Sequence, residues 1–559
     1  FDKDKATRSE LDRSITVIAH ELAHMWFGDL VTMKWWDGIW LNEAFASLME
    51  VIASYNTYPE FKQWNAMNMS RTAGFSIDSL ENSRPVEFDV ETPDQAEEMF
   101  DVLTYEKGST VLRMFQMFIG EEAFQNGVEA YLNKFKFENT NSSDLWDALS
   151  EASNQPLNKI LPFWIREKGY PFLQVDCSNN FLTIKQKPFL LKNVETDKNN
   201  IKPVPVQIKF LDTGNEEKFL LDDTERVIDL KNLGKVPHVN SGGWGFFHTF
   251  YDDEVFENIL ANFDKLNDLE KYRLLEDKWM QFKKAPTDIN HFYKFLMFFK
   301  KEKDEDIWIY MSSIIATIAN LFESNNSDSF KTFVRDLTDE LHNELGFEVK
   351  KDEELEIKEV RDTINKLRAK NLDDDAFIKK FSDIFKENKM ESISEGTFFS
   401  SILFISALDE TNKIETFLEK FENAESPQMQ GRYRAVLGQV RDQNASKKIV
   451  EFMLDGRIRG ADCPYILASM ITNKYIGKKS WKVIKENFND LLCVMPDWTA
   501  SRILDALPAI YDEEFADDIK NFIKKNPLPS SEKLAAQKLE RLEANIEFMD
   551  NLKEVNNET

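Results

Sequence analysis

The stretch VIAHELAHMWFGDL, residues 17–30, places two histidines four positions apart, with a glutamate directly after the first. On a helix, His20 and His24 project from the same face and can bind one ion about 2.0–2.1 Å from each nitrogen. Glu21 then lies about 100° further round the helix, where its carboxylate can accept a proton from water beside the ion. By itself, so short a pattern fits two hydrogen-bonded core histidines as well as a metal site.

The segment has the spacing of a helix. Apolar residues recur at three- and four-residue steps, at Leu11, Ile15, Ile18, Leu22 and Met25. Ser9 and Asp12 are candidates for the N-terminal cap, and Gly28 follows the last turn. We therefore predict a helix between these two signals, with both histidines on one face.

A third ligand decides whether the histidines form a catalytic zinc site, because such sites usually take three protein ligands and leave the fourth position for water. No histidine follows His24 before His238, which excludes a third histidine at a short offset. Gly38 is expected to interrupt regular secondary structure, and a second apolar helix is predicted to begin near Trp40. Glu43 lies on the first turns of that helix.

Three other acidic residues compete with Glu43 by composition. Asp29 and Asp37 fall in the predicted connection between the two helices. Glu50 lies two turns further along the second helix, and we expect it to be too far round and too far away. A helix dipole favours an acidic residue near any helix start, so the residue types alone leave the third ligand open.

The longer segment HELAHMWFGDLVTMKWWDGIWLNEAFAS, residues 20–47, closely resembles the M1 family of zinc aminopeptidases, or gluzincins. The signature of that family is HExxH, eighteen residues, then Glu. The resemblance implies that His20, His24 and Glu43 bind one Zn²⁺ and that Glu21 is the general base. It implies hydrolysis of N-terminal residues from peptides, most similar to the puromycin-sensitive and tricorn-interacting types.

A second segment, FDVLTYEKGSTVLRM at residues 100–114, matches the YxKG motif of the same family. The resemblance makes Tyr105 the candidate donor of a hydrogen bond to the oxyanion of the tetrahedral intermediate. Glu21 is then expected to take a proton from the attacking water and to pass it to the departing amine.

Two alternatives stand beside the aminopeptidase. One is another M1-type hydrolase, an endopeptidase or an epoxide hydrolase, and the other is a non-catalytic helical scaffold. The family motif Gly-x-Met-Glu-Asn, which holds the substrate's free amine, does not occur, and the sequence begins nineteen residues before His20. We therefore expect a chain that lacks the N-terminal domain and the first part of the catalytic domain, and no substrate-binding residue is assigned.

The sequence also departs from the family pattern at single positions. Met25 and Ala44 stand where Gln and Gly are common, Arg84 stands before Pro85 where His-Pro is common, Ile165 and Glu167 replace Thr and Gln, and Phe247 with His248 replaces Tyr-Arg. Met25 is expected to point away from the ligand face, and His248 is expected to be a sandwich or boundary residue. The role of Arg84 stays open.

Composition restricts the partners. The chain has 98 acidic against 70 basic residues, a net charge of −28. Such a surface repels nucleic acid and anionic membranes and favours cationic partners such as peptide N-termini. No apolar run approaches the ~18–20 residues that span a bilayer. The chain has only three cysteines, and they lie far apart at Cys177, Cys463 and Cys493, which predicts that the protein is located in the reducing cytoplasm. The sequence does not indicate the oligomeric state.

We predict a multi-domain, mostly α-helical protein. Residues 1–172 form the C-terminal part of a thermolysin-like catalytic domain, because the helical pattern closes with FWIREKGYPF, which resembles the end of that domain. Residues 173–253 alternate in short segments typical of a small β-sandwich. Residues 254–559 are periodic helices, expected as a superhelical HEAT/ARM-like domain. Within them, residues 458–492 resemble the distal helical domain of M1 enzymes.

Overall fold

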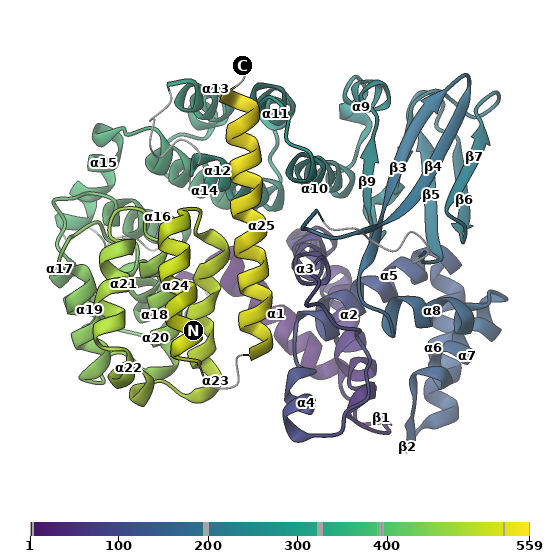
Figure 1. Cartoon of the computed structure of the whole chain (residues 1–559), viewed down its shortest axis with the longest axis horizontal. Helices are drawn as coiled ribbons and strands as arrows, with labels where there is room; N and C mark the ends of the chain where they lie inside the picture. Colours follow the sequence, from purple (N-terminus) through teal and green to yellow (C-terminus); the bar gives the residue numbers. More distant parts are fainter. Residues whose placement is uncertain are drawn as a thin grey trace. The chain divides into compact units, whose positions relative to one another are not determined.

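The computed structural model describes residues 2, 5–193, 201–320, 328–350, 352–387, 390, 393, 396–528 and 532–557. The chain is mostly helical, with small sheets (Figure 1). It divides into two compact units, Asp12–Ala285 and Phe1–Leu11 with Pro286–Thr559, and each is considered by itself. A search of the described helices found none with the length and hydropathy of a membrane span. The three predicted domains, residues 1–172, 173–253 and 254–559, stay predictions.

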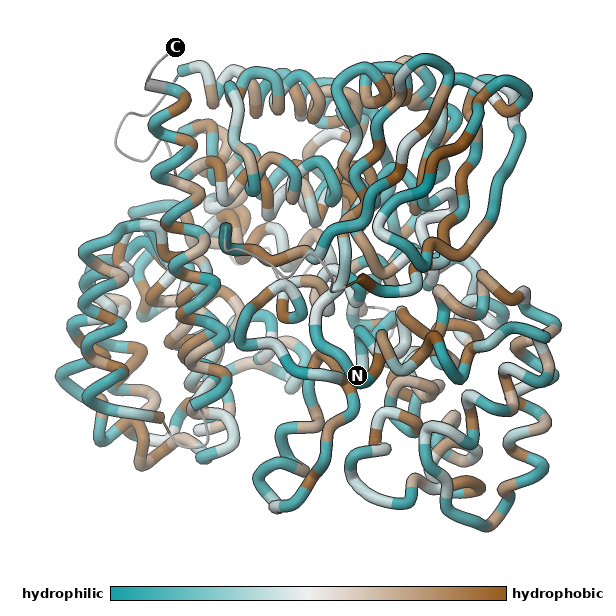
Figure 2. The backbone as a smooth tube through the Cα atoms, turned by 45° about the vertical axis from the view of Figure 1, so that its right-hand side comes forward, coloured by the Kyte–Doolittle hydropathy of each residue, from teal (hydrophilic) through white to brown (hydrophobic). Residues whose placement is uncertain are grey.

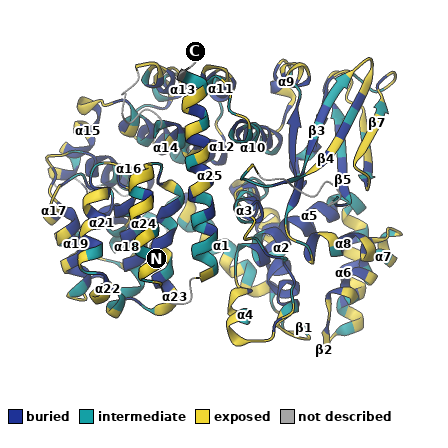
Figure 3. Ribbon diagram, viewed as in Figure 1, coloured by how far each residue is buried: buried dark blue, intermediate teal, exposed yellow. Residues whose placement is uncertain are grey.

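The helices around the predicted site are α1 (Arg8–Ala23), α2 (Trp40–Thr57), α3 (Gln63–Asp78), α4 (Pro93–Glu98), α5 (Gly108–Ile119), α6 (Glu121–Phe135), α7 (Ser142–Ser153) and α8 (Leu157–Ile165). Helices α1 and α2 confirm the two helices predicted from spacing, but α1 ends at Ala23, so that His24 lies in the turn directly after it. The first half of α2 and most of α5 are buried (Figure 3). Two short parallel strands, β1 (Val31–Met33) and β2 (Glu138–Thr140), lie beside them. Tyr105 is on a π-helical turn, η4 (Leu103–Lys107), which leads directly into α5.

The predicted cap of α1 is wrong. Ser9 and Asp12 lie inside the helix, and the cap is formed by Thr7 and Glu10. The backbone N–H of Glu10 donates to Oγ1 of Thr7 over 3.1 Å, and the N–H of Thr7 donates to the Glu10 carboxylate over 3.0 Å. This reciprocal pairing satisfies two backbone donors, so Thr7 is a better start than Ser9.

The apolar positions of α1 do not face a packed core. Ile18, Leu22 and Met25 are 62%, 58% and 57% exposed. With residues of α2 and α6 they line an open hollow of about 1250 Å³. Periodicity predicts which face of a helix is apolar, but it carries no information on what covers that face.

Two small sheets occupy the region where alternation predicted strands. They consist of β3 (Tyr170–Ser178), β4 (Phe181–Phe189), β7 (Glu225–Asp229) and β9 (His248–Tyr251) in the order β7-β4-β3-β9, and of β5 (Val204–Phe210) between β6 (Glu216–Leu221) and β8 (Pro237–Val239). Hydrophobic and hydrophilic residues alternate along these strands (Figure 2). On β4, buried Leu182 and Ile184 alternate with less buried neighbours, as expected of a sheet with one covered face.

Helices α9 (Asp253–Leu260) and α10 (Asp268–Lys284) close this unit. His248 of β9 is completely buried, and its Nδ1 donates to Oδ1 of Asp277 on α10 over 2.8 Å. Its Nε2 lies 3.3 Å from the hydroxyl of Tyr170. His248 therefore joins the sheet to α10, in agreement with the boundary role expected for it.

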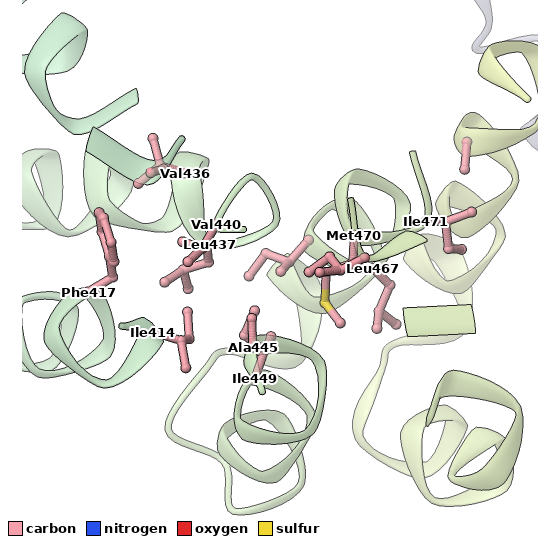
Figure 4. Packing of buried hydrophobic residues seen from close by; sticks show 14 of the residues in the cluster. Ile414, Phe417, Val436, Leu437, Val440, Ala445, Ile449, Leu467, Met470 and Ile471 are labelled. Atoms are coloured by element: carbon pink, nitrogen blue, oxygen red, sulfur yellow. The ribbon is translucent and has the colours of Figure 1, made fainter. Parts of the chain in front are cut away.

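The second unit is built from packed helices. They include α12 (Glu305–Ala319), α13 (Asp328–Leu345), α14 (Leu355–Asn371), α15 (Asp375–Lys386), α16 (Gly396–Ala407), α17 (Ile414–Glu422), α18 (Pro427–Leu437), α19 (Ala445–Leu454), α20 (Cys463–Ile471), α21 (Gly477–Glu486), α24 (Glu513–Lys525) and α25 (Glu532–Asn557). Helices α12, α14, α16, α18 and α20 pack in succession, with α13, α15, α17 and α21 against them, and α19 packs on α17 and α21. A continuous core of aliphatic and aromatic side chains, including Phe417, Leu437 and Leu467, joins the layers (Figure 4).

Residues 1–11 belong to this second unit. Nε of Arg8 lies 2.7 Å from the Glu305 carboxylate, and the backbone N–H of Arg8 donates to Glu359 over 3.2 Å. Glu10 pairs with Arg432 at 2.8 Å. Burial raises the pKa of Glu305 to about 9 in spite of Arg8, and burial with the nearby charge of Asp362 raises the pKa of Glu359 to about 7. The start of the ligand-bearing helix α1 is therefore held by the carboxylates of Glu305 and Glu359.

We expect Glu359→Gln to weaken the pH dependence of stability between pH 5 and pH 8. The folded chain holds the Glu359 proton up to a pKa of about 7, above the ordinary value of 4.5 for a glutamate side chain. The stability linked to that proton is therefore complete below pH 4.5 and lost as the pH rises through 7. The neutral amide removes this decline.

The measurement is the melting temperature of parent and variant at pH 5 and pH 8. Glu415→Gln, an exposed position on α17, is the control and should keep the parent's decrease. An unchanged decrease in Glu359→Gln would show that this carboxyl does not titrate with folding.

Candidate metal centre

The side chains of His20, His24 and Glu43 converge. Oε2 of Glu43 lies 3.4 Å from Nε2 of His20 and 3.4 Å from Nε2 of His24. The edges of a tetrahedron around zinc, with bonds of 2.0–2.1 Å, measure roughly 3.3–3.4 Å. The structure thus brings the three predicted ligands to a spacing that fits one Zn²⁺. Among the described residues, this is the only group of three or more ligand-type side chains found within 4.8 Å of one another.

Both imidazoles are oriented by a partner on the ring nitrogen that faces away from the group. Nδ1 of His20 donates to the Glu50 carboxylate over 2.7 Å. Nδ1 of His24 donates to the backbone carbonyl of Phe27 over 2.9 Å, in the turn that follows α1. With Nδ1 of each ring protonated, the lone pair of each Nε2 is free to bind a cation beside Glu43. Metal-binding histidines are usually held in this way.

The competing acidic residues take different places. Neither Asp29 nor Asp37 belongs to the converging group. Glu50 does not belong to it either, as expected of a residue too far away to be the third ligand, but it contacts His20 on the opposite ring nitrogen. The sequence did contain a signal for this contact: Glu50 is seven residues after Glu43, two turns along α2 and therefore on the same face.

The carboxylates create a site for positive charge. Burial lowers the pKa of His20, but the hydrogen bonds to Glu43 and Glu50 outweigh burial and raise it to about 9. Burial raises the pKa of Glu43, yet its contacts with His20, His24 and Tyr105 outweigh burial and lower it. Surroundings that hold a proton on His20 also favour a cation in its place, since metal and proton compete for the same nitrogen.

Tyr105 lies against the same group. Its hydroxyl hydrogen-bonds Glu43, and its ring is 6.0 Å from that of His20. Burial and the charge of Glu43 raise its pKa above the ordinary value, so the phenol stays protonated and remains a hydrogen-bond donor at neutral pH. Glu21 is exposed on α1, and its charge contributes to the raised pKa of Tyr105. The two groups that sequence reasoning assigned to proton transfer and oxyanion binding are therefore neighbours.

A chain with this fold and this group of side chains has the features of a metallopeptidase. Residues 1–164 match the Peptidase family M1 domain, and residues 238–544 match the ERAP1-like C-terminal domain. The chain belongs to the M1 peptidase family.

Several curated proteins are similar to it. Aminopeptidase 2, mitochondrial, of Saccharomyces cerevisiae is 26% identical over 100% of this chain and 60% of its own length. The puromycin-sensitive aminopeptidase of Caenorhabditis elegans is 32% identical over 62% of this chain and 38% of its own. Tricorn protease-interacting factor F2 of Thermoplasma volcanium is 34% identical over 54% and 37%. The chain spans less than two thirds of the length of these relatives.

We expect Glu50→Gln to weaken Zn²⁺ binding without unfolding the protein. The amide keeps the size of the side chain but loses the charge that orients and polarises His20. Loss of such a partner typically costs about 10–100-fold in metal affinity. Competition with a chelator of known affinity gives the dissociation constant. Glu151→Gln, at an exposed position on α7, is the control, and equal affinities for the two variants would contradict the orienting role of Glu50.

Proposed function

We propose that the protein is a zinc-dependent aminopeptidase that hydrolyses N-terminal residues from peptides. The observation that carries this proposal is the convergence of His20, His24 and Glu43, with the Glu43 carboxylate 3.4 Å from each histidine, in a chain of the M1 peptidase family. One Zn²⁺ would be held by Nε2 of both histidines and by the Glu43 carboxylate. The relatives bear aminopeptidase names, which favours peptides with a free N-terminus as substrates.

Bound Zn²⁺ supplies a Lewis acid that polarises the scissile carbonyl and lowers the pKa of a water molecule. The exposed carboxylate of Glu21 accepts the proton of the attacking water and later donates it to the departing amine. The phenol of Tyr105 donates a hydrogen bond to the carbonyl oxygen as negative charge develops on it. Glu50 keeps His20 in the tautomer whose Nε2 faces the cation.

The proposal extends to the domain architecture and the cellular compartment. We propose that the succession of helix layers from α12 to α21 forms a superhelical array of the HEAT/ARM type, because consecutive layers pack on one another along the chain. The helices before β3 then belong to a thermolysin-like catalytic domain. Three free cysteines support a reducing compartment such as the cytoplasm.

Glu21→Gln tests the base assignment. The variant should bind as much Zn²⁺ as the parent, because Glu21 is not among the converging ligands, and it should hydrolyse an aminoacyl amide far more slowly. The decrease should exceed that of Tyr105→Phe. Metal content by elemental analysis, measured beside turnover, separates the base from a ligand. Parent-like turnover with zinc bound would exclude Glu21 as the base.

Tyr105→Phe tests the oxyanion donor. Removal of one such donor costs about 10²–10³-fold in kcat at comparable sites. The ring remains, so the 6.0 Å packing on His20 and the metal content should be unchanged.

A chromogenic substrate with a free amine and its N-blocked twin distinguish the alternatives. An aminopeptidase cleaves only the first, an endopeptidase cleaves both, and a scaffold binds Zn²⁺ with no turnover of either. Cleavage of both substrates at similar rates would overturn the proposed specificity, and zinc binding without any turnover would overturn the proposed activity.

A further inference from the structure

The turn that carries Tyr105 has an unusual geometry. Leu103–Lys107 form a π-helical turn between α4 and α5. Such turns are rare, and they occur frequently at functional sites because they place a side chain where a regular helix would not. A turn of this kind persists only when its surroundings hold it in place. The contacts at its two ends therefore decide where the Tyr105 hydroxyl lies.

Arg84 holds the beginning of the turn. Its side chain is only 5% exposed. Nε donates to the Asp101 carboxylate over 3.2 Å, and Nη2 donates to Oγ1 of Thr104 over 3.0 Å. Asp101 in turn accepts the backbone N–H groups of Leu103 at 2.9 Å and Thr104 at 3.2 Å. One guanidinium thus fixes both the residue that caps the turn and the residue that precedes Tyr105.

The terminal nitrogens of the Arg84 guanidinium, Nη1 and Nη2, also bond to backbone carbonyls. Nη1 donates to the backbone carbonyls of Pro85 at 2.7 Å and Val86 at 3.1 Å. Nη2 also reaches the carbonyls of Glu98 and Met99, each at 3.4 Å. A lysine ammonium is a single point with three donors and cannot make these planar, divergent bonds together. The position requires an arginine for its geometry and not only for its charge.

The end of the turn is held by a different pair. Lys107 and Asp78 of α3 are both fully buried, and their charged atoms are 2.8 Å apart. Asp78 also accepts the backbone N–H of Gly169 and the hydroxyl of Ser83, each over 2.8 Å. Removal of one partner from a buried pair is strongly destabilising. A substitution of either residue would therefore destabilise the whole fold, so this pair cannot be used to test the position of Tyr105 alone.

A close approach sets the distance from the turn to Glu43. Gly108 follows η4 directly, and a Cβ at this position would lie 2.7 Å from Cβ of Ala44. Ala44 is the residue after Glu43 on α2. Helix α5 therefore contacts α2 beside the ligand, and small shifts of η4 translate into shifts of Tyr105 relative to Glu43.

We propose that Arg84 is a positioning residue that holds the Tyr105 hydroxyl at the oxyanion site by fixing the start of the π-helical turn. The proposal rests on the function proposed above for Tyr105. The Arg84 guanidinium bonds to Asp101, to Thr104 and to backbone carbonyls around the start of the turn. It acts through Tyr105, so its contribution to turnover exists only while the phenol is present.

A double-mutant cycle tests this dependence. Arg84→Lys keeps the charge but loses the fork, and in the parent background kcat should fall about 10–100-fold, as expected for a shift of the order of 1 Å in a catalytic group. KM and zinc content should change little. In the Tyr105→Phe background, Arg84→Lys should cause no further decrease, because the group that it positions is already missing.

Arg361→Lys is the matched control. Arg361 is also a buried arginine bound to a carboxylate, that of Glu353, but it lies on α14 in the other unit. It should leave kcat unchanged in both backgrounds while lowering thermal stability to a degree comparable with Arg84→Lys. A decrease in kcat for Arg84→Lys that is equal with and without the Tyr105 phenol, or no decrease at all, would overturn the proposal.

Hydrogen exchange separates this proposal from the proposed function. Peptides that cover residues 101–108 should exchange faster in Arg84→Lys than in the parent and in Arg361→Lys, whether or not the protein turns over a peptide. If the parent proves inactive with zinc bound, the proposed function fails, and unchanged exchange in this segment would independently refute the anchoring by Arg84.

Discussion

Three ligand atoms can bind one cation only if two helices are held in a fixed relation. The fixed relation between α1 and α2 is the constraint on which the rest of this site depends. The connection between them is tied at several points: Phe27 stacks on Phe45 of α2 at 4.6 Å, and Oγ1 of Thr32 donates to the carbonyl of Gly28 over 2.6 Å. The carbonyl of Phe27 also orients His24. The same short segment thus packs the helices together and aims a ligand.

Electrostatics reinforce this geometry. Glu43 and Glu50 lie on opposite sides of His20, and Glu106 is buried nearby with a pKa raised by burial. An excess of carboxylates in a partly buried place is unfavourable unless positive charge compensates it. A divalent cation bound by these residues would supply that charge. The negative group therefore explains both why His20 binds a proton tightly and why a cation can replace it.

The supports of Tyr105 show how one site depends on distant parts of the chain. Arg84 precedes the turn, Asp78 lies on α3, and Ala44 lies on α2, yet all three contact the segment around Tyr105. Several of these contacts involve charged side chains with almost no exposure. Such groups stabilise a structure only when every donor and acceptor finds a partner. The position of the phenol is therefore set by packing as much as by its own motif.

The sequence by itself determined the local structure and the composition of the site. Spacing predicted α1 and α2, alternation predicted short strands within residues 173–253, and the segment from His20 to Glu43 indicated the family. These features are readable because helix and strand periods, and the offset of two histidines, are local properties. The predicted cap at Ser9 failed because neighbouring polar residues compete for the same role.

Only the tertiary structure decided which distant side chains meet. It showed that Glu50 bonds to His20 and that Arg84 bonds to Thr104 at the start of the Tyr105 turn. It also showed that the apolar face of α1 is exposed around Leu22. Each of these depends on how two elements far apart in the sequence pack together. A periodic pattern states which face of an element avoids water, whereas the partner of that face is set by the packing of the whole chain.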